Sequence, residues 1–176
     1  MEPDSLLAAL LPAARAAFTE LANTMEQPEY CGYALYSDAG AMTVSCAVNT
    51  PAHLVSAQAG DPDDAAYYTW TPAEWALEGV GHEHFTGLSQ HLLALSAADP
   101  TTDLLQRRAM VYEACVATLE ALVTEGVLGR GEDTVVVFAL SDHSDPEREV
   151  DWIRRLNPPS QARRFARWLH STSVQA

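Results

Sequence analysis

Apolar residues recur about every 3.6 positions near the N-terminus and then in short β-type runs, which predicts a helix followed by strands. Residues 4–25 carry one apolar stripe that includes Leu6, Leu7, Leu10, Ala14, Ala17, Phe18 and Leu21. Pro12 lies inside this stripe and either kinks the helix or begins a second one, because proline lacks an amide donor. The stretch 30–50 then contains two β-runs joined by a turn through Asp38 and Gly40, which predicts a hairpin.

Three short segments follow the hairpin. Residues 51–59 favour a helix with Thr50 as its cap, because proline suits the first helical position. The acidic loop 60–64 is the clearest exposed break in the chain. The aromatic run Tyr67–Trp70 predicts a third strand, since aromatic side chains favour pleated surfaces.

The segment TPAE after that run has the form of a capping box. Thr71 can accept a hydrogen bond from the Glu74 amide while the Glu74 side chain reaches back. Trp70 and Trp75 occupy the two positions of a hydrophobic staple. The pattern therefore predicts a helix that begins at Pro72.

The second half of the chain alternates helical and strand patterns. The expected elements are a helix over 84–98, a helix over 103–125 ended by Gly126, an apolar strand over 134–140, a helix from Asp145 to Leu156 and a last helix after Pro159. The uniformly apolar strand fits a position at the sheet centre or one covered on both faces. Together these elements predict a single α+β domain over residues 1–176, with helices packed on a mostly antiparallel sheet of about four strands.

Charge is distributed unevenly along the chain. The net charge is −14, all ten basic residues are arginine, and thirteen of the net negative charges lie before Arg107. Phosphate backbones repel such a surface, so nucleic-acid binding is disfavoured. A basic protein partner would be attracted, although an acidic surface also serves plain solubility.

Other features of the sequence point to the cytoplasm. Charges or prolines interrupt every apolar run before the ~20 residues that a membrane span needs. The first residues are acidic, whereas a signal or transit peptide is basic. Three cysteines are an odd number without metal-type spacing, so no disulfide framework or zinc knuckle is expected.

Four segments occur in the order and spacing of a bacterial family: CGYALYSD, TWTPAEWALEG, a late strand ending in SD, and DWIRRLNP. Over roughly residues 16–169 the chain resembles the domain of unknown function catalogued as number 4303. Members of that family share a GYALY-type strand, a W-x-P-x-E-W segment and a terminal LNP. The resemblance implies a small cytoplasmic bacterial protein, of a kind suspected of serving as toxin immunity proteins. It carries over no catalytic residue and no cofactor.

Two clusters are candidates for a catalytic or metal site. His82 and His84 flank Glu83, with Glu78 one turn earlier, and an H-x-H pair on a strand can chelate zinc. The pair follows a glycine-containing loop and no third ligand is placed by spacing, so we expect neither metal nor cofactor. A Ser-Asp-His run over 141–143 cannot form a triad by itself, because adjacent side chains point apart.

Aromatic residues concentrate near the acidic part of the chain, a combination typical of protein interfaces. We therefore predict a protein-binding module rather than an enzyme, plausible as an immunity protein that neutralises a basic toxin. The expected contact residues are Asp61, Asp63, Asp64, Tyr67, Glu78 and Glu83. The alternatives are a small metal-dependent hydrolase that uses His82, His84 and Glu78, or a scaffold protein whose aromatic face forms a homodimer.

Overall fold

The computed structural model describes residues 3–24, 29–79, 81–98, 104–129, 131–141 and 145–173. In these ranges seven α-helices accompany a four-stranded sheet, which confirms the α+β class. The strands are β1 (Gly32–Ser37), β2 (Val44–Asn49), β3 (Leu77–Glu78) and β4 (Val135–Leu140). The helices are α1 (Pro3–Thr24), α2 (Pro51–Gly60), α3 (Ala65–Trp70), α4 (Glu83–Ala98), α5 (Leu104–Glu125), α6 (Pro146–Leu156) and α7 (Pro159–Ser173), with 3-10 turns η1 (Pro62–Asp64) and η2 (Pro72–Glu74).

The sheet is mixed rather than wholly antiparallel: two of its three strand pairings are antiparallel and one is parallel. Its strand order is β3-β2-β1-β4, and β2 runs antiparallel to both of its neighbours. β1 and β4 are parallel, with Gly32 opposite Val135 and Ser37 opposite Leu140. A parallel pair needs a long crossover connection, and here the chain from β2 to α5 supplies it. The apolar strand β4 lies at the edge of the sheet and not at its centre.

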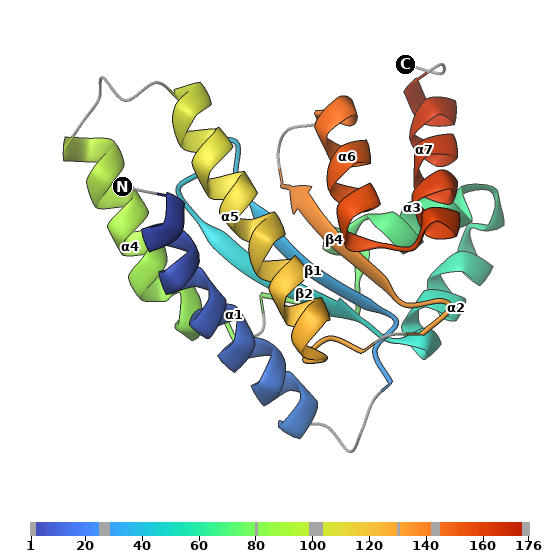
Figure 1. Cartoon of the computed structure of the whole chain (residues 1–176). Coiled ribbons are helices and arrows are strands. Elements are labelled where there is room, and N and C mark those ends of the chain that lie inside the picture. Colours follow the sequence, from blue (N-terminus) through green and yellow to red (C-terminus); the bar gives the residue numbers. More distant parts are fainter. Residues whose placement is uncertain are drawn as a thin grey trace.

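Helices cover both faces of the sheet, as Figure 1 shows. On the first face α1, α4 and α5 pack on side chains such as Leu35, Cys46 and Phe138. On the second face α3 and α7 pack on Ala34 and Val137. Successive strand residues point to opposite faces, so β4 contributes alternately to two cores and is apolar throughout.

Helix α6 lies along the outer edge of β4 (Figure 1). Its Trp152 belongs to the core of the first face, and the next residue, Ile153, belongs to the core of the second face. A helix in this position shields the edge strand from other chains.

The hairpin between β1 and β2 forms as predicted, but its turn places Ala41 rather than Gly40 in the left-handed backbone conformation. Asp38 organises the turn, because its carboxylate accepts hydrogen bonds from the Met42 amide at 3.1 Å and the Thr43 amide at 2.7 Å. The residue with positive φ is Ala41, at 53°, and not Gly40. The turn is therefore held by the aspartate's hydrogen bonds rather than by glycine's freedom.

Helix α1 runs through Pro12 without a break, so the alternative of two helices is wrong. Its segment Ser5–Asn23 is long and apolar enough to cross a membrane by length and composition, contrary to the expectation from the sequence. A core helix of a soluble protein passes the same test, and α1 buries Leu10 and Phe18 against the first face.

The region around Trp70 differs from its prediction. Tyr67–Trp70 forms the last four residues of helix α3 and not a strand. The predicted capping box begins only a single 3-10 turn, and the Thr71 side chain makes no cap hydrogen bond. The Glu74 carboxylate instead accepts a hydrogen bond from the Tyr67 hydroxyl at 3.0 Å. The extended chain after η2 then pairs as β3, which a longer helix would prevent.

Several predicted helix ends are confirmed. The Thr50 hydroxyl accepts a hydrogen bond from the His53 amide at the start of α2. Helix α5 ends at Gly126, whose φ of 76° is the left-handed stop expected of glycine. Asp145 caps α6 and Asn157 ends it.

Candidate functional site

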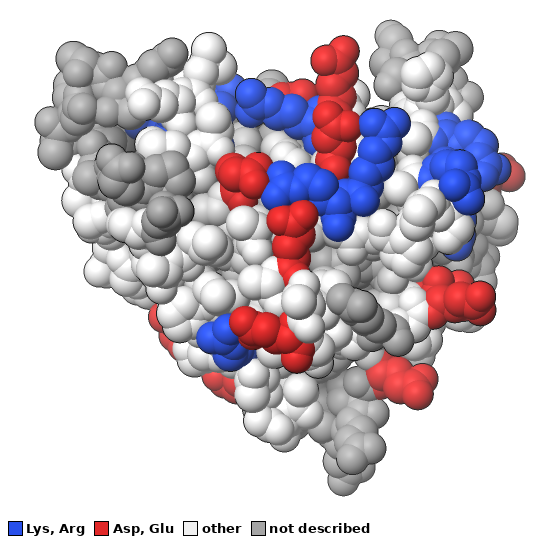
Figure 2. Space-filling view, in the orientation of Figure 1, with Lys and Arg blue, Asp and Glu red and all other residues white. Residues whose placement is uncertain are grey.

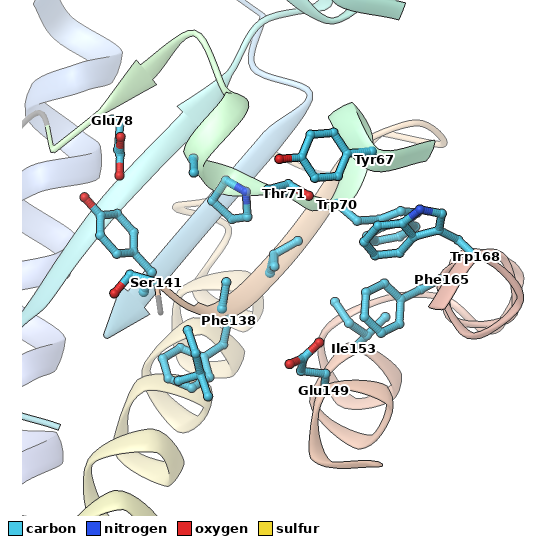
Figure 3. A pocket seen from close by; sticks show the side chains of 16 residues that line it. Tyr67, Trp70, Thr71, Glu78, Phe138, Ser141, Glu149, Ile153, Phe165 and Trp168 are labelled. Atoms are coloured by element: carbon cyan, nitrogen blue, oxygen red, sulfur yellow. The ribbon is translucent and has the colours of Figure 1, made fainter. Parts of the chain in front are cut away.

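A pocket of about 400 Å³ opens on the second face of the sheet, at the C-terminal end of β4 (Figure 3). Helices α3, α6 and α7 and the segment from η2 to β3 form its walls. It is lined by Tyr36, Tyr67, Trp70, Thr71, Pro72, Ala73, Glu78, Val137, Phe138, Ala139, Leu140, Ser141, Glu149, Ile153, Phe165 and Trp168. Its volume falls within the ~300–1,000 Å³ typical of ligand sites.

Aromatic rings form one side of the pocket. Trp70, from α3, packs edge-to-face on Phe165, from α7, with ring centroids 5.2 Å apart. Trp168 continues this group, 5.7 Å from Phe165. Figure 3 shows these three rings together, with Tyr67 above them. Such faces carry partial negative charge and attract cations.

Two carboxylates stand on opposite sides of the pocket in Figure 3. Glu78 is exposed on β3, at the side where Tyr36 also lines the pocket. Burial raises the pKa of the Tyr36 hydroxyl, and the carboxylate of Glu78 raises it further against the opposing hydrogen bond with Ser45. Tyr36 therefore remains protonated near neutral pH and can donate a hydrogen bond.

Glu149, on the first turn of α6, is the second carboxylate. It accepts a hydrogen bond from the Asp145 amide at 2.8 Å, and the Asp145 side chain accepts one from the Arg148 amide. This reciprocal cap fixes the position of Glu149 at the rim.

The structure divides the predicted contact residues among three places. Tyr67 and Glu78 line the pocket. Asp61, Asp63 and Asp64 line a neighbouring groove of about 850 Å³, which Arg164 and Arg167 of α7 also line.

The sixth predicted residue, Glu83, lies away from the pocket lining. It gathers with Glu20 of α1 and His84, whose ligand atoms all lie within 4.8 Å of one another. The His84 Nε2 is 2.7 Å from the Glu20 carboxylate, and the His82 ring is 3.5 Å from Glu83.

The structure also places Ser141 of the Ser-Asp-His run and the three cysteines. Ser141 lines the pocket, while residues 142–144 of the Ser-Asp-His run lie outside the described residues. All three cysteines are buried thiols outside any disulfide. Burial raises the pKa of the Cys46 thiol to about 12 and also raises those of Cys31 and Cys115, which disfavours thiolate chemistry.

Several arginines on the described surface pair with acids of the same chain. Arg155 bonds Glu113 and Glu120 on α5, both at 2.7 Å, and these hydrogen bonds raise the pKa of its guanidinium. In Figure 2 side chains of both signs are mixed over α5 and α6. Basic side chains gather at the right of the same view, over α7.

The sequence analysis did not name Glu149, Phe165 and Trp168 as site residues. They lie on α6 and α7, more than seventy residues beyond Glu78 in the chain, and only the fold brings them to one pocket. The sequence does predict that these residues lie on helices. Their spacing, however, gives no indication that the helices pack near β3.

The sequence profile of the family described as Domain of unknown function (DUF4303) matches residues 10–158. The match covers most of the chain, so the protein belongs to this family. No curated protein and no solved structure matches the chain. The family resemblance read from the sequence is thus confirmed.

Proposed function

We propose that this member of the DUF4303 family is a cytoplasmic protein-binding module that neutralises a basic protein, as an immunity protein neutralises a toxin. The observation that carries this proposal is the pocket beside β4, which aromatic rings line together with Glu78 and Glu149. Aromatic anchors are enriched in protein interfaces, and carboxylates beside them favour a basic partner.

The overall charge supports the same class of partner. A net charge of −14 raises the rate at which a basic protein approaches, and salt screens this attraction beyond ~8 Å. The pocket adds specificity to that long-range attraction, because none of the residues that line it is Arg or Lys. An incoming cation therefore meets no competing cation among them.

The geometry supports the hydrolase alternative less well. That alternative needs His82, His84 and Glu78 in one site. Glu78 lines the pocket, whereas His84 lies with Glu20 and Glu83 against α1. Within the described residues, these three groups therefore do not converge on one metal position.

The proposal is tested with the product of the neighbouring gene, where that product is basic. Co-production of the two proteins should restore growth that the basic protein alone arrests. Purified together, they should form a complex with a Kd of about 1 μM or tighter, and the association rate should fall as salt rises. A basic protein encoded elsewhere in the same genome is the control. The absence of a complex at about 10 μM, or equal binding to the control protein, would contradict the proposal.

A further inference from the structure

We propose that Glu20, Glu83 and His84 form a site for one zinc ion, which ties helix α1 to the start of helix α4. One ligand atom from each of these three side chains lies within 4.8 Å of the other two. The cluster lies outside the lining of the pocket beside β4, so this inference goes beyond the proposed function and does not depend on it.

The third ligand comes from a distant part of the chain. Spacing in the sequence places no third ligand beside His82 and His84, and the expectation of no metal followed from that. In the structure the Glu20 carboxylate lies 2.7 Å from the His84 Nε2, although the two residues are sixty-four positions apart. Glu20 also makes a further interaction within the chain. Such an interaction is compatible with a metal site, because ligating carboxylates are commonly hydrogen-bonded as well.

A close approach of two backbones holds α1 against this end of α4. The two helices pack side by side (Figure 1). Gly81 lies just before α4 with a φ of 75°, and an added Cβ there would lie 2.9 Å from the Cβ of Ala17. Glu20 follows Ala17 by three positions on the same side of α1, and so it faces the first turn of α4. The packing of the main chain thus positions the ligands without help from an ion.

The three ligand atoms suit tetrahedral zinc. Zinc binds imidazole nitrogen and carboxylate oxygen, and bonds of ~2.1 Å put neighbouring ligand atoms about 3.4 Å apart. The His84 Nε2 lies 2.7 Å from the Glu20 oxygen and 4.0 Å from the Glu83 oxygen, on either side of that separation. Both glutamates are exposed, so small rotations of their side chains bring the three atoms to bonding distance. Three protein ligands leave the fourth position to water.

The charges of the cluster also favour a divalent cation. Carboxylate oxygens of Glu20 and Glu83 lie within 4.8 Å of each other, and like charges at this distance repel. Among the described residues, the ion pairs of Glu83 are with His82 and His84, and a histidine lacks the permanent charge of an arginine. A zinc ion between the two carboxylates neutralises both. Magnesium and calcium prefer oxygen ligands, so the imidazole favours zinc over them.

Titration with zinc chloride tests the inference directly. The protein, freed of any affinity tag and treated with a chelator, should bind one ion per chain with a Kd of about 10 μM or tighter. Magnesium at about 1 mM should not compete. Because the three ligands converge only in the folded chain, zinc at about one hundred times its Kd should raise the Tm by about 5 °C or more. The absence of saturable binding would overturn the inference and leave Glu20 and His84 as an ion pair between two helices.

Variants locate the binding. Glu20→Gln, Glu83→Gln and His84→Gln should each weaken zinc binding at least about tenfold, since even the hydrogen-bond partners of metal ligands matter by that factor. The matched controls are Glu132→Gln and His91→Gln, which make the same changes at exposed positions outside the cluster and should lose less than about twofold. Circular dichroism checks that each variant is folded. Equal losses in the controls would show that zinc responds only to the composition of the surface, and would overturn the inference.

Two further measurements test the ligand set. The exposed His82 ring lies 3.5 Å from the Glu83 carboxylate, and His82→Gln should weaken zinc binding less than about threefold. A loss of about tenfold would overturn the assignment of three ligands, because it would add His82 to them. X-ray absorption of the zinc-loaded protein should show nitrogen and oxygen neighbours, whereas sulfur at ~2.3 Å would place the ion on a cysteine and contradict the site. Binding of the basic protein is measured separately, so either proposal can fail while the other stands.

Discussion

The Asn157 side chain pairs with both backbone groups of Val136 at the outer edge of β4. Its Oδ1 accepts from the Val136 amide at 2.8 Å, and its Nδ2 donates to the Val136 carbonyl at 2.6 Å. The amide thus occupies the place of a neighbouring strand. It explains the terminal LNP segment as a structural feature that ends α6 and protects the sheet edge.

Replacing this residue should destabilise the protein. Asn157→Ala leaves both backbone groups of Val136 buried without their partner, which should cost about 3 kcal/mol. Asn23→Ala, at an exposed position on α1, is the control and should change stability by less than about 0.5 kcal/mol. Urea denaturation measures both. Equal midpoints for the two variants would show that the edge pairing is unimportant.

The features predicted well from the sequence are those decided by local chemistry. The hairpin turn at Asp38, the cap at Thr50 and the stop at Gly126 depend on residues within a few positions of one another. The run Tyr67–Trp70 was misassigned because its aromatic residues favour strands in general. Here the segment continues the helix that follows η1 and buries Trp70 under α7.

Contacts between segments far apart in the chain could not be predicted from the sequence. The parallel pairing of β1 with β4 joins segments about one hundred residues apart, and no local pattern encodes its direction. The same holds for the candidate site, where Glu78 on β3 lines one pocket with residues of α6 and α7. It holds also for His84, whose nearest acid is Glu20, sixty-four positions away.

The residues of the mispredicted capping box give a second test of stability. Trp75 is 5% exposed, and its indole lies over Gly32, where an added Cβ would meet the ring at 3.0 Å. Trp75→Ala should therefore cost about 3–5 kcal/mol. Thr71→Ala should cost less than about 0.5 kcal/mol, because the Thr71 side chain makes no cap hydrogen bond. Thermal and urea denaturation compare the two. A loss of about 1 kcal/mol in Thr71→Ala would restore the capping interpretation.

The turn at Asp38 should make stability depend on pH. Burial alone would raise the pKa of Asp38, but hydrogen bonds from Thr43, Met42 and Gly40 outweigh it, so the pKa lies below 3.8. The carboxylate therefore stabilises the fold above its unfolded pKa. This contribution is lost as pH falls through the folded pKa.

The substitution Asp38→Asn isolates that contribution. It should cost about 1 kcal/mol at pH 7, and the difference from the original protein should shrink below pH 4. Asp63→Asn, in the exposed acidic loop, is the control and should show no such trend. A difference that is constant from pH 7 to pH 3 would contradict the role given to the carboxylate.

Charge reversal in the acidic loop should affect binding of the basic partner only slightly. The double variant Asp63→Arg and Asp64→Arg should keep its fold, because both side chains are exposed. It should lower the association rate by less than about threefold, since the loop lies outside the pocket and shares its own groove with Arg164 and Arg167. Stopped-flow kinetics at low and high salt measure the effect. If this variant lowers the association rate more than substitutions in the pocket do, the interface lies at the loop instead.

The most direct test of the central claim is the affinity of pocket variants for the basic product of the neighbouring gene. The double variant Glu78→Gln and Glu149→Gln should bind at least tenfold more weakly, a loss of about 1.4 kcal/mol or more. The control variant Glu132→Gln and Glu147→Gln removes the same charge from exposed positions outside the pocket, and should lose less than about twofold. Calorimetric titration gives both values under one salt condition. Equal losses in the two double variants, or none in either, would contradict the assignment of this pocket as the partner-binding site.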